Sequence, residues 1–436
     1  MRGKILFIFI ILPIVGLFSC EEYIGGDIAT DSNAPANPPV QSLLTSVQLN
    51  IAYSYGGFFS RTNSVLVQHI EAIARGIRFD TNDSELYNDV WNTFYSSVLI
   101  EINTIQRLAE EQGFNHYLAV ANILEAFSIM AMTDVFGSIP YSEAGLGIKN
   151  LNPSFDSQEE IYDAVHSLLD EAITLLKGPS GSVIPQQEDF IYNGDIDRWE
   201  KAAHALKARA YLHFADYEQA ISEAIISFDD PNDNMSFSFT GEDYPAPWYN
   251  YNQSRTGDFE FHPVLDSRMI SLNDNSRLSQ LDLAFTSSHP YFSVDQKLDL
   301  ISYREIQFIL SEARLEQGNS ATEIRDSYLN GINASFIDMG YDDNSDEFNS
   351  YISQTQVDPG VGNIGLEHIL TQKHIALFSS PESYTDWRRK GIPNLVPFVG
   401  TAIQVRWPYP QTTLVFNENA IHNVDIFSDR VAWDID

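Results

Sequence analysis

Cysteine is almost absent from this sequence, since Cys20 is the only one among 436 residues. A single cysteine excludes a disulfide within the chain and a zinc site built from several thiolates. Three common enzyme patterns are also missing: H-E-x-x-H of metalloproteases, G-x-S-x-G of serine hydrolases and G-x-x-x-x-G-K-[ST] of nucleotide-binding loops. We therefore expect no cofactor and assign no metal-binding residue, whereas a structural metal ion and a hydrolase built on carboxylates stay open at this point.

Basic residues are scarce as well. The chain has 25 Lys and Arg against 60 Asp and Glu, which gives a formal net charge of −35 at pH 7. A field of this sign repels nucleic acid and anionic lipid, so neither is an expected partner, whereas neutral ligands such as sugars stay open. The hydrophobic share of 44% and the aromatic share of 12% are typical of a folded protein.

Long apolar runs are confined to the start of the chain. Behind Arg2 and Lys4, residues 5–18 form an apolar run that is too short for a membrane span. The run ends in LFSC, which resembles a bacterial lipoprotein signal, in which lipid is attached to the cysteine and the preceding residues are removed. We therefore expect residues 1–19 to be a signal peptide and Cys20 to be the lipidation site.

The rest of the chain divides in two by composition. Residues 21–39 are acidic, contain Gly and Pro and have few large apolar side chains, so residues 20–39 are predicted to be a flexible tether. In residues 40–436 apolar periodic segments alternate with polar loops, which predicts one domain. No second apolar run is long enough to cross a bilayer, so membrane contact is expected through the lipid anchor only.

The strongest helical pattern lies at residues 199–221. Two neighbouring stripes of apolar residues recur there at intervals of three or four, with Leu206 near the centre of the first stripe. A helix with two apolar sides is typical of a helical stack, not of a lone surface helix. The two stripes are Trp199, Ala203, Leu206, Ala210, Phe214, Tyr217 and Ile221, and Ala202, Ala205, Ala208, Leu212 and Ala215.

Further helices are marked by their ends. Ser157 and Glu160 have the spacing of a capping box, and so do Ser320 and Glu323 at the start of the second helix of a predicted hairpin. Helix pairs of this length predict a mostly α fold, with a scaffold of tetratricopeptide-like hairpins, long loops and a few short strands near residues 405–416. The other helices are expected near 61–75, 84–111, 115–134, 303–317, 321–338 and 364–378.

Residues 239–262 place many large rings in a segment without a helical period and with prolines that interrupt a strand. Sugars carry C–H patches that pack on aromatic faces and hydroxyls that need polar neighbours, so this composition suits a shallow sugar site. The alternative is that the rings form the core of a loop subdomain; the rings of residues 53–59 are expected to pack in this way. The candidate ligand-binding residues are Tyr244, Trp248, Tyr249, Asn250, Tyr251, Asn252 and Arg255.

Four stretches carry a resemblance to a known family: MTDVFGSIPYSEA (132–144), DFIYNGDIDRWEKAAHALKARAYLHFADY (189–217), HILTQKHIALFSSPESYTDWRRKGIPNL (368–395) and VRWPYPQTTLVFN (405–417). In this order behind a lipoprotein signal, they resemble the SusD/RagB family of nutrient-binding outer-membrane lipoproteins, in particular its shorter SusD-like branch. Most of these shared residues look structural. We expect Arg388 and Arg389 to pair with carboxylates and helix-end carbonyls.

The resemblance implies a location and a partner. Members of this family lie on the outer face of the outer membrane, where each acts as a lid on a TonB-dependent SusC-like transporter. They capture oligosaccharides or other nutrients, are not enzymes, and carry their ligand face on loops of a helical scaffold.

Two other functions stay open at this stage. The abundance of carboxylates allows a surface glycan hydrolase, although no particular pair stands out. The tetratricopeptide-like helices allow an adhesive or peptide-binding surface protein.

Overall fold

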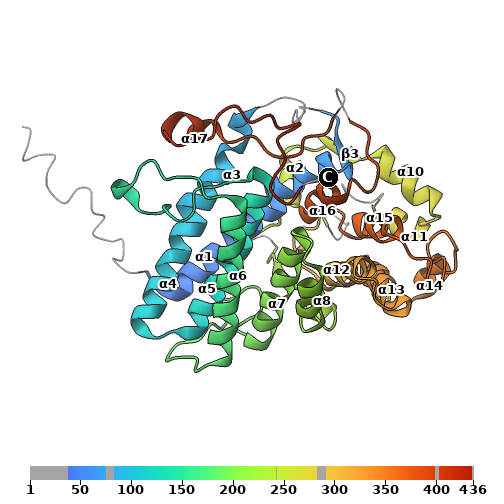
Figure 1. Ribbon diagram of the computed structural model, residues 1–436, viewed down its shortest axis with the longest axis horizontal. Coiled ribbons are helices and arrows are strands. Elements are labelled where there is room, and N and C mark those ends of the chain that lie inside the picture. The colour runs from blue at the N-terminus through green and yellow to red at the C-terminus, as the bar shows by residue number, and fades with distance from the viewer. Residues whose placement is uncertain (1–37, 75–82, 242, 282–290, 398–401, 435–436) are drawn as a thin grey trace, which may run out of the picture. The chain divides into compact units, whose positions relative to one another are not determined.

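The structure is a computed structural model that describes residues 38–74, 83–241, 243–281, 291–397 and 402–434. The predicted signal peptide, Cys20 and most of the predicted tether lie outside these ranges. Residues Val40–Asp436 form one compact unit. Helices dominate the described part of this unit, which confirms the mostly α prediction (Figure 1).

Two long helices begin the unit, and each contains a wider π-helical stretch. The first consists of α1 (Val40–Tyr53), η2 (Ser54–Phe59) and α2 (Ser60–Leu66), and the second of α3 (Asn88–Thr93), η4 (Phe94–Leu99) and α4 (Ile100–Gln112). The remaining α-helices are α5 (Asn115–Phe136), α6 (Gln158–Lys177), α7 (Ile196–His213), α8 (Tyr217–Ile225), α9 (Pro247–Ser254), α10 (Pro263–Ser271), α11 (Asn275–Leu281), α12 (Tyr303–Glu316), α13 (Ala321–Asp338), α14 (Asp346–Ile352), α15 (Leu366–Ala376), α16 (Glu382–Lys390) and α17 (Gln411–Phe416).

Short elements connect these helices. The 3₁₀ turns are η3 (Ser84–Tyr87), η5 (Gly147–Lys149) and η6 (Pro231–Asp233). Strands β1 (Ile70–Ala72) and β3 (Phe259–Phe261) pair antiparallel, and so do β2 (Met235–Ser238) and β4 (Lys297–Ile301). Both pairs join segments far apart in sequence, with Ile70 opposite Phe261 and Met235 opposite Ile301. The predicted helix at 61–75 therefore ends early, because the chain after Leu66 turns into strand β1.

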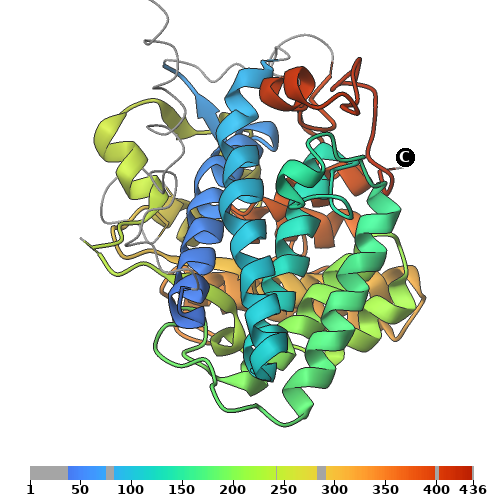
Figure 2. The same cartoon turned by 90° about the vertical axis from the view of Figure 1, so that its left-hand side faces the viewer.

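Sequential helices pack side by side as the predicted hairpins require. Helix α5 packs between α4 and α6 (Figure 2). Helix α7 packs on α6 and α8, and α12 packs on α13. The capping box at Ser157 and Glu160 is formed. At the predicted box of Ser320 the side chain makes no capping hydrogen bond, so that detail is wrong.

Helix α5 runs through the interior of the unit. By length and composition it is apolar enough to cross a membrane, which the sequence analysis did not anticipate, but 94% of its most apolar window is buried inside the protein. Burial on all sides gives a helix this composition without any membrane. Its long apolar surface is therefore the centre of the helical core.

The predicted helix at 199–221 is broken in two. Trp199, Leu206 and Ala210 are fully buried in α7 as expected. The chain then reverses at Ala215, whose φ of 58° is left-handed. The Asp216 side chain accepts a hydrogen bond from the backbone N–H of Gln219 and caps α8. A local cap therefore ends the apolar periodicity that predicted one continuous helix.

Residues 405–416 form no strand. Helix α17 begins after Pro410, and the backbone N–H of Thr412 donates to Asn88 Oδ1 at 3.1 Å. The backbone of Thr412 is therefore bonded to a side chain at the start of α3. A strand would instead have to pair with the edge of a sheet. The prediction of short strands here is wrong.

The four stretches that carry the family resemblance meet in the interior. The backbone N–H of Trp407 donates to Val135 O at 2.7 Å, and Tyr409 Oη donates to Ser138 O at 2.7 Å. Arg388 Nη1 donates to the Asp134 carbonyl at 2.6 Å, at the end of α5. These contacts join the end of α5 to the third and fourth stretches, so the shared residues hold elements together.

Gly137 stands at this junction for two reasons. Its φ is +75°, which disfavours any residue with a side chain, and a Cβ there would lie 3.2 Å from the Arg406 guanidinium. Arg406 in turn donates to the Phe136 carbonyl. The turn after α5 is therefore a packing feature.

We call Asp134, Tyr162, His213, Glu382 and Trp433 the polar seam. Tyr162 Oη lies 2.5 Å from Asp134 Oδ1 and 2.6 Å from His213 Nδ1, and His213 Nε2 lies 2.8 Å from Glu382 Oε1. Trp433 Nε1 donates to Asp134 Oδ1 at 2.9 Å. The seam thus joins α5, α6, α7, α16 and the chain near residue 433.

Within the polar seam, the hydrogen-bonded chain from Asp134 through Tyr162 and His213 to Glu382 needs one more proton than a neutral tyrosine and a neutral histidine supply. The three links between Asp134, Tyr162, His213 and Glu382 each need a proton, whereas Tyr162 and a neutral His213 carry one each. Burial raises the pKa of Glu382 to about 7 and raises that of Asp134, and it lowers the pKa of His213 to about 4. The third proton therefore belongs to a carboxyl group.

Charged pairs continue from the seam. Arg209 Nε donates to Glu305 Oε1 at 2.7 Å, and Arg389 Nη1 donates to Glu312 Oε1 and Nη2 to Asp386 Oδ1, both at 2.8 Å. These groups are buried. The expectation that Arg388 and Arg389 pair with helix-end carbonyls and carboxylates is confirmed.

Candidate functional site

The segment expected to be irregular contains both a helix and a strand. Pro247 occupies the first turn of α9, where its fixed φ suits a helix and its missing N–H costs nothing. Strand β3 forms because Phe259 and Phe261 pair with β1, almost two hundred residues earlier. The prediction of no regular structure in residues 239–262 is therefore wrong at 247–254 and 259–261.

The ring of Trp248 is enclosed. It is 1% exposed, and its Nε1 donates to Ser60 Oγ at 2.9 Å. The Phe292 ring meets it edge-on with centroids 4.8 Å apart, and the Phe259 centroid lies at 5.9 Å. The structure thus places Trp248 in the core of its subdomain, the alternative that the sequence left open. We call Arg61, Trp248, Tyr251, Phe259 and Phe292 the ring cluster.

Arg61 of α2 contacts two rings of the ring cluster. Its guanidinium carbon lies 4.5 Å from the Tyr251 ring centroid and 5.9 Å from that of Trp248. Burial lowers the pKa of Arg61 to about 10, so the arginine keeps its charge at neutral pH, and a cation over an aromatic face is favourable. Tyr251 Oη donates to Asp258 Oδ2 at 3.0 Å. Tyr251 is therefore half-buried, with its ring against a cation and its hydroxyl occupied.

Tyr249 points away from Tyr251. Residues two apart on a helix face roughly opposite sides. Tyr249 packs against the main helical core, whereas Tyr251 packs against the second cluster around Trp248. Helix α9 therefore divides these two candidate rings between two hydrophobic clusters.

The remaining candidates lie towards solvent. Tyr244 is 39% exposed, with Phe190 at a centroid distance of 6.4 Å. Asn250 is exposed, and its Nδ2 reaches the Pro245 carbonyl at 3.4 Å; Tyr53 Oη donates to the same carbonyl at 2.8 Å. The structure thus brings Tyr244, Asn250 and Tyr53 together around Pro245.

The other two polar candidates lie further along α9. Asn252 is half-buried, and Arg255 is exposed beyond the last residue of the helix. Ligand contact by all of these residues stays a prediction. Sequence reasoning missed Arg61, and it expected Tyr53, among the rings of residues 53–59, to pack in a core. Both residues belong to the first long helix, and only the fold brings them to α9.

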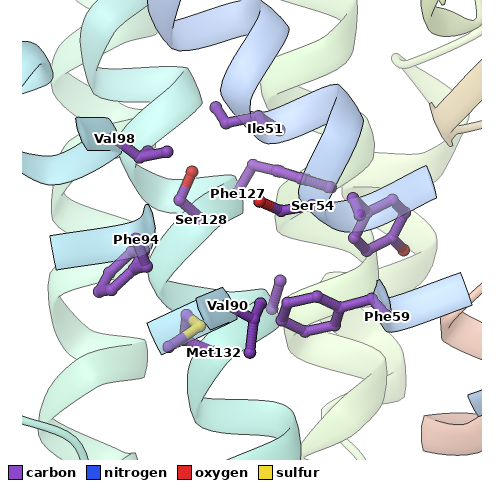
Figure 3. A pocket seen from close by; sticks show the side chains of 11 residues that line it. Ile51, Ser54, Phe59, Val90, Phe94, Val98, Phe127, Ser128 and Met132 are labelled. Atoms are coloured by element: carbon purple, nitrogen blue, oxygen red, sulfur yellow. The ribbon is translucent and has the colours of Figure 1, made fainter. Parts of the chain in front are cut away.

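A small cavity lies between the two π-helical stretches and α5 (Figure 3). Its volume is about 30 Å³, and its lining is almost entirely apolar, with Phe59, Val90, Phe94 and Phe127 among the side chains. A space of this size holds about one water molecule, and an apolar space of this kind stays empty. The cavity is too small and too apolar for a sugar.

One group of buried side chains has metal-ligand spacing. The ligand atoms of Asp134, His213 and Glu382 lie within 4.8 Å of one another. Both nitrogens of His213 and one oxygen of each carboxylate are already engaged in the polar seam. The contacts present are those of a hydrogen-bonded structural network.

The comparisons with known proteins agree on one family. The sequence model of a SusD-like family, described as starch-binding and associating with the outer membrane, matches residues 32–285 and 275–410. No curated protein matches the chain.

Solved structures share the fold across most of the chain. A SusD/RagB family protein from Bacteroides thetaiotaomicron is 20% identical, with a TM-score of 0.75 over 91% of this chain and 99% of that one. A SusD homologue from Bacteroides uniformis is 20% identical, with a TM-score of 0.74 over 91% and 99%.

A chitin-binding SusD homologue from Flavobacterium johnsoniae is similar as well. It is 18% identical, with a TM-score of 0.74 over 91% of this chain and 98% of that one. Because the family model spans most of the sequence and the fold agrees over nine-tenths of it, the chain belongs to the SusD-like family.

Proposed function

We propose that this protein is a cell-surface lipoprotein that captures oligosaccharides and delivers them to a partner TonB-dependent SusC-like transporter. The observation that carries the proposal is the family match over most of the chain, because that family is described as starch-binding and associating with the outer membrane. A chitin-binding homologue with the same fold supports a glycan ligand. The protein binds its ligand without cleaving it.

The proposed capture surface surrounds Pro245 and the exposed side of α9. Tyr244 supplies an exposed ring, and the exposed Asn250 reaches the carbonyl of the neighbouring Pro245. A ring face for sugar C–H groups next to an amide for hydroxyls is the combination that a wet sugar site needs. Tyr251, Asn252 and Arg255 extend this surface, while Trp248 supports it from within.

Binding is tested by calorimetric titration of the purified full-length protein in detergent. The probes are neutral oligosaccharides prepared from starch and from chitin, with a lysine-rich peptide as the alternative ligand. Saturable binding of at least one oligosaccharide supports the proposal. Binding of the peptide alone would favour the adhesive or peptide-binding function instead.

The proposed anchor is tested at Cys20. Cys20→Ala removes the thiol that would receive lipid, so the variant is expected in the soluble fraction or as an unprocessed precursor. Ser19→Ala is the matched control, because a small residue before the cysteine is retained and membrane attachment should persist. A Cys20→Ala variant that is processed and still membrane-bound would contradict lipid anchoring.

The proposed transporter partner is tested by affinity purification from detergent-solubilised outer membranes. The tagged protein should carry a TonB-dependent receptor with it. Recovery of the tagged protein alone, from cells that express such a receptor beside it, would contradict this part of the proposal.

A further inference from the structure

An open groove is lined by residues between Asp230 and Ile352 that lie outside α9. It is bordered by η6, the first residue of α12, the outer face of α13, the following loop and α14. Helices α12, α13 and α14 lie close together in Figure 1. Its volume is about 850 Å³, within the range of about 300–1,000 Å³ that is usual for ligand pockets. None of the seven candidate residues in and around α9 lines it.

One face of α13 gives the groove a continuous wall. Asp326, Asn330, Asn333 and Ile337 recur at intervals of three or four residues, so they form one stripe along the helix. Asp326 and Asn330 are exposed. The other side of α13 packs on α12. The stripe therefore presents a carboxylate and two amides to the groove along a rigid element.

The loop after α13 is held in place by its own side chains. Asn333 Nδ2 donates to Asp343 Oδ1 at 2.6 Å, and Asn344 Nδ2 donates to the same oxygen at 3.0 Å. Asn349 Nδ2 donates to the Asn344 carbonyl at 2.7 Å. Polar groups fixed in this way lose little conformational entropy when a ligand binds.

Tyr303 supplies an aromatic surface in the groove. Its side chain is half-buried, and its hydroxyl makes no hydrogen bond within the described part of the chain. Burial, and then the carboxylates of Asp230, Asp229 and Asp343, raise the pKa of the Tyr303 phenol. The phenol thus stays neutral and has a hydroxyl available to a ligand.

The charge of the lining selects among ligands. The carboxylates of Asp230, Asp326 and Asp343 line the groove, and no lysine or arginine is among its lining residues. An anionic ligand is therefore repelled. A neutral polyol is suited to the groove, because planar carboxylates and amides accept and donate hydrogen bonds to neighbouring hydroxyls while an aromatic face covers C–H groups.

We propose that this groove is a second saccharide-binding site, which holds a neutral sugar between the Tyr303 ring and the polar side chains of α13 and its following loop. This inference rests on the proposed function, since it assigns the same ligand class to a separate surface. Two separate sites on one chain would let it hold two parts of a long glycan, which strengthens binding without new contacts at either site.

The test blocks the groove with a bulky substitution and measures ligand protection at the groove and at α9 in the same experiment. Asn330→Trp places a large ring in the groove from an exposed position of α13, and Thr322→Trp is the matched control, exposed on the same helix but outside the groove. Hydrogen exchange followed by mass spectrometry is measured on the full-length protein with and without a neutral starch- or chitin-derived oligosaccharide.

In the wild type and in Thr322→Trp, sugar should protect the peptides that cover residues 326–349 as well as those of α9. In Asn330→Trp the first protection should disappear, and titration should show affinity at that site weakened by about tenfold or more, while protection at α9 persists. Tyr244→Ala should show the reverse pattern.

Three results overturn the inference. Sugar that protects α9 and leaves residues 326–349 unchanged removes the second site while the proposed function stands. Failure of every neutral oligosaccharide to bind the wild type overturns both. A lysine-rich peptide that protects residues 326–349, with no sugar that does so, assigns the groove to a peptide.

Discussion

The polar seam is buried, and so is the centre of the ring cluster at Trp248, Phe259 and Phe292, yet the two are built from different kinds of side chain. In the seam, Asp134, His213 and Glu382 are taken out of water and held by one another and by Tyr162. In the ring cluster, Trp248 and Phe292 are held mainly by the apolar area that they remove from water. Both stabilise the chain, but a substitution acts differently in each.

The contrast also shows that residue type alone does not locate a function. Arg209 of α7 and Arg389 of α16 belong to the interior, because each has a buried carboxylate partner there, Glu305 and Glu312. Trp248 of the Pro- and Asn-rich segment belongs to the interior as well, because α9 turns its ring into the second hydrophobic cluster. The positions available to a ligand near α9 are therefore the exposed ones, such as Tyr244, Asn250 and Arg255.

The largest expected effect is at the charged side of the comparison. Arg389→Ala leaves Glu312 and Asp386 buried without their cation, so the free energy of unfolding should fall by about 3–5 kcal/mol. Arg107→Ala is the control, because its pair with Glu111 is exposed and should change stability by less than about 1 kcal/mol. Denaturant unfolding measures both. Equal small losses in the two variants would show that the interior pairs contribute no more than surface pairs.

Trp248→Ala tests the aromatic side. It empties a large enclosed volume, so the free energy of unfolding should fall by about 3–5 kcal/mol, while the folded fraction should bind oligosaccharide with normal affinity. Trp248→Phe keeps much of the ring and loses the hydrogen bond to Ser60, at a cost nearer 1 kcal/mol. Unchanged stability with weakened binding would return Trp248 to the ligand surface.

Glu382→Gln tests the proton of the seam. Burial raises the pKa of Glu382 from 4.5 to about 7, so between these pH values the folded chain holds a proton that the unfolded chain releases. Stability from this group is therefore present below about pH 4.5 and is lost as the pH rises towards 7. Gln imitates the protonated carboxyl at every pH.

The measurement is the melting temperature of wild type and Glu382→Gln at pH 5 and pH 8. The variant should gain stability relative to the wild type at the higher pH. Comparison of the two proteins removes the contribution of other titrating groups. A difference that does not change with pH would mean that Glu382 is ionised throughout.

The smallest expected change in stability is at Tyr244. Because its ring is 39% exposed, Tyr244→Ala should change the free energy of unfolding by less than about 0.5 kcal/mol and weaken oligosaccharide binding by about 1–3 kcal/mol. Tyr244→Phe keeps the ring face and should retain most of the binding. Normal oligosaccharide binding by Tyr244→Ala would show that the Tyr244 ring does not contribute to the capture surface.

The sequence predicted the helical scaffold because its signals are local. The Leu206 stripe and the capping box at Ser157 depend on residues three or four positions apart, and both are present in the structure. The break after α7 was within reach, since Asp216 stands three residues before Gln219 as a helix cap. The prediction followed the apolar period across residues 199–221 and did not use this capping signal.

The surroundings of the candidate site depend on contacts that no local pattern records. Strand β3 forms only because β1 lies beside it, and Arg61 reaches Tyr251 from α2, almost two hundred residues earlier in the chain. Helix α9 is too short for an apolar period to show. The groove at α13 had a local signal in the stripe from Asp326 to Ile337, but its partner Tyr303 is brought there by the packing of α12 on α13.

The central claim is that this chain captures an oligosaccharide and leaves it intact. It is tested most directly by incubating the purified protein with a neutral oligosaccharide that it binds, and measuring bound sugar and sugar chain length in the same sample over time. We expect the bound fraction to stay constant over time and to saturate with protein concentration, and the sugar chain length to stay unchanged. A steady release of shorter products, or no bound sugar of any length, would contradict it.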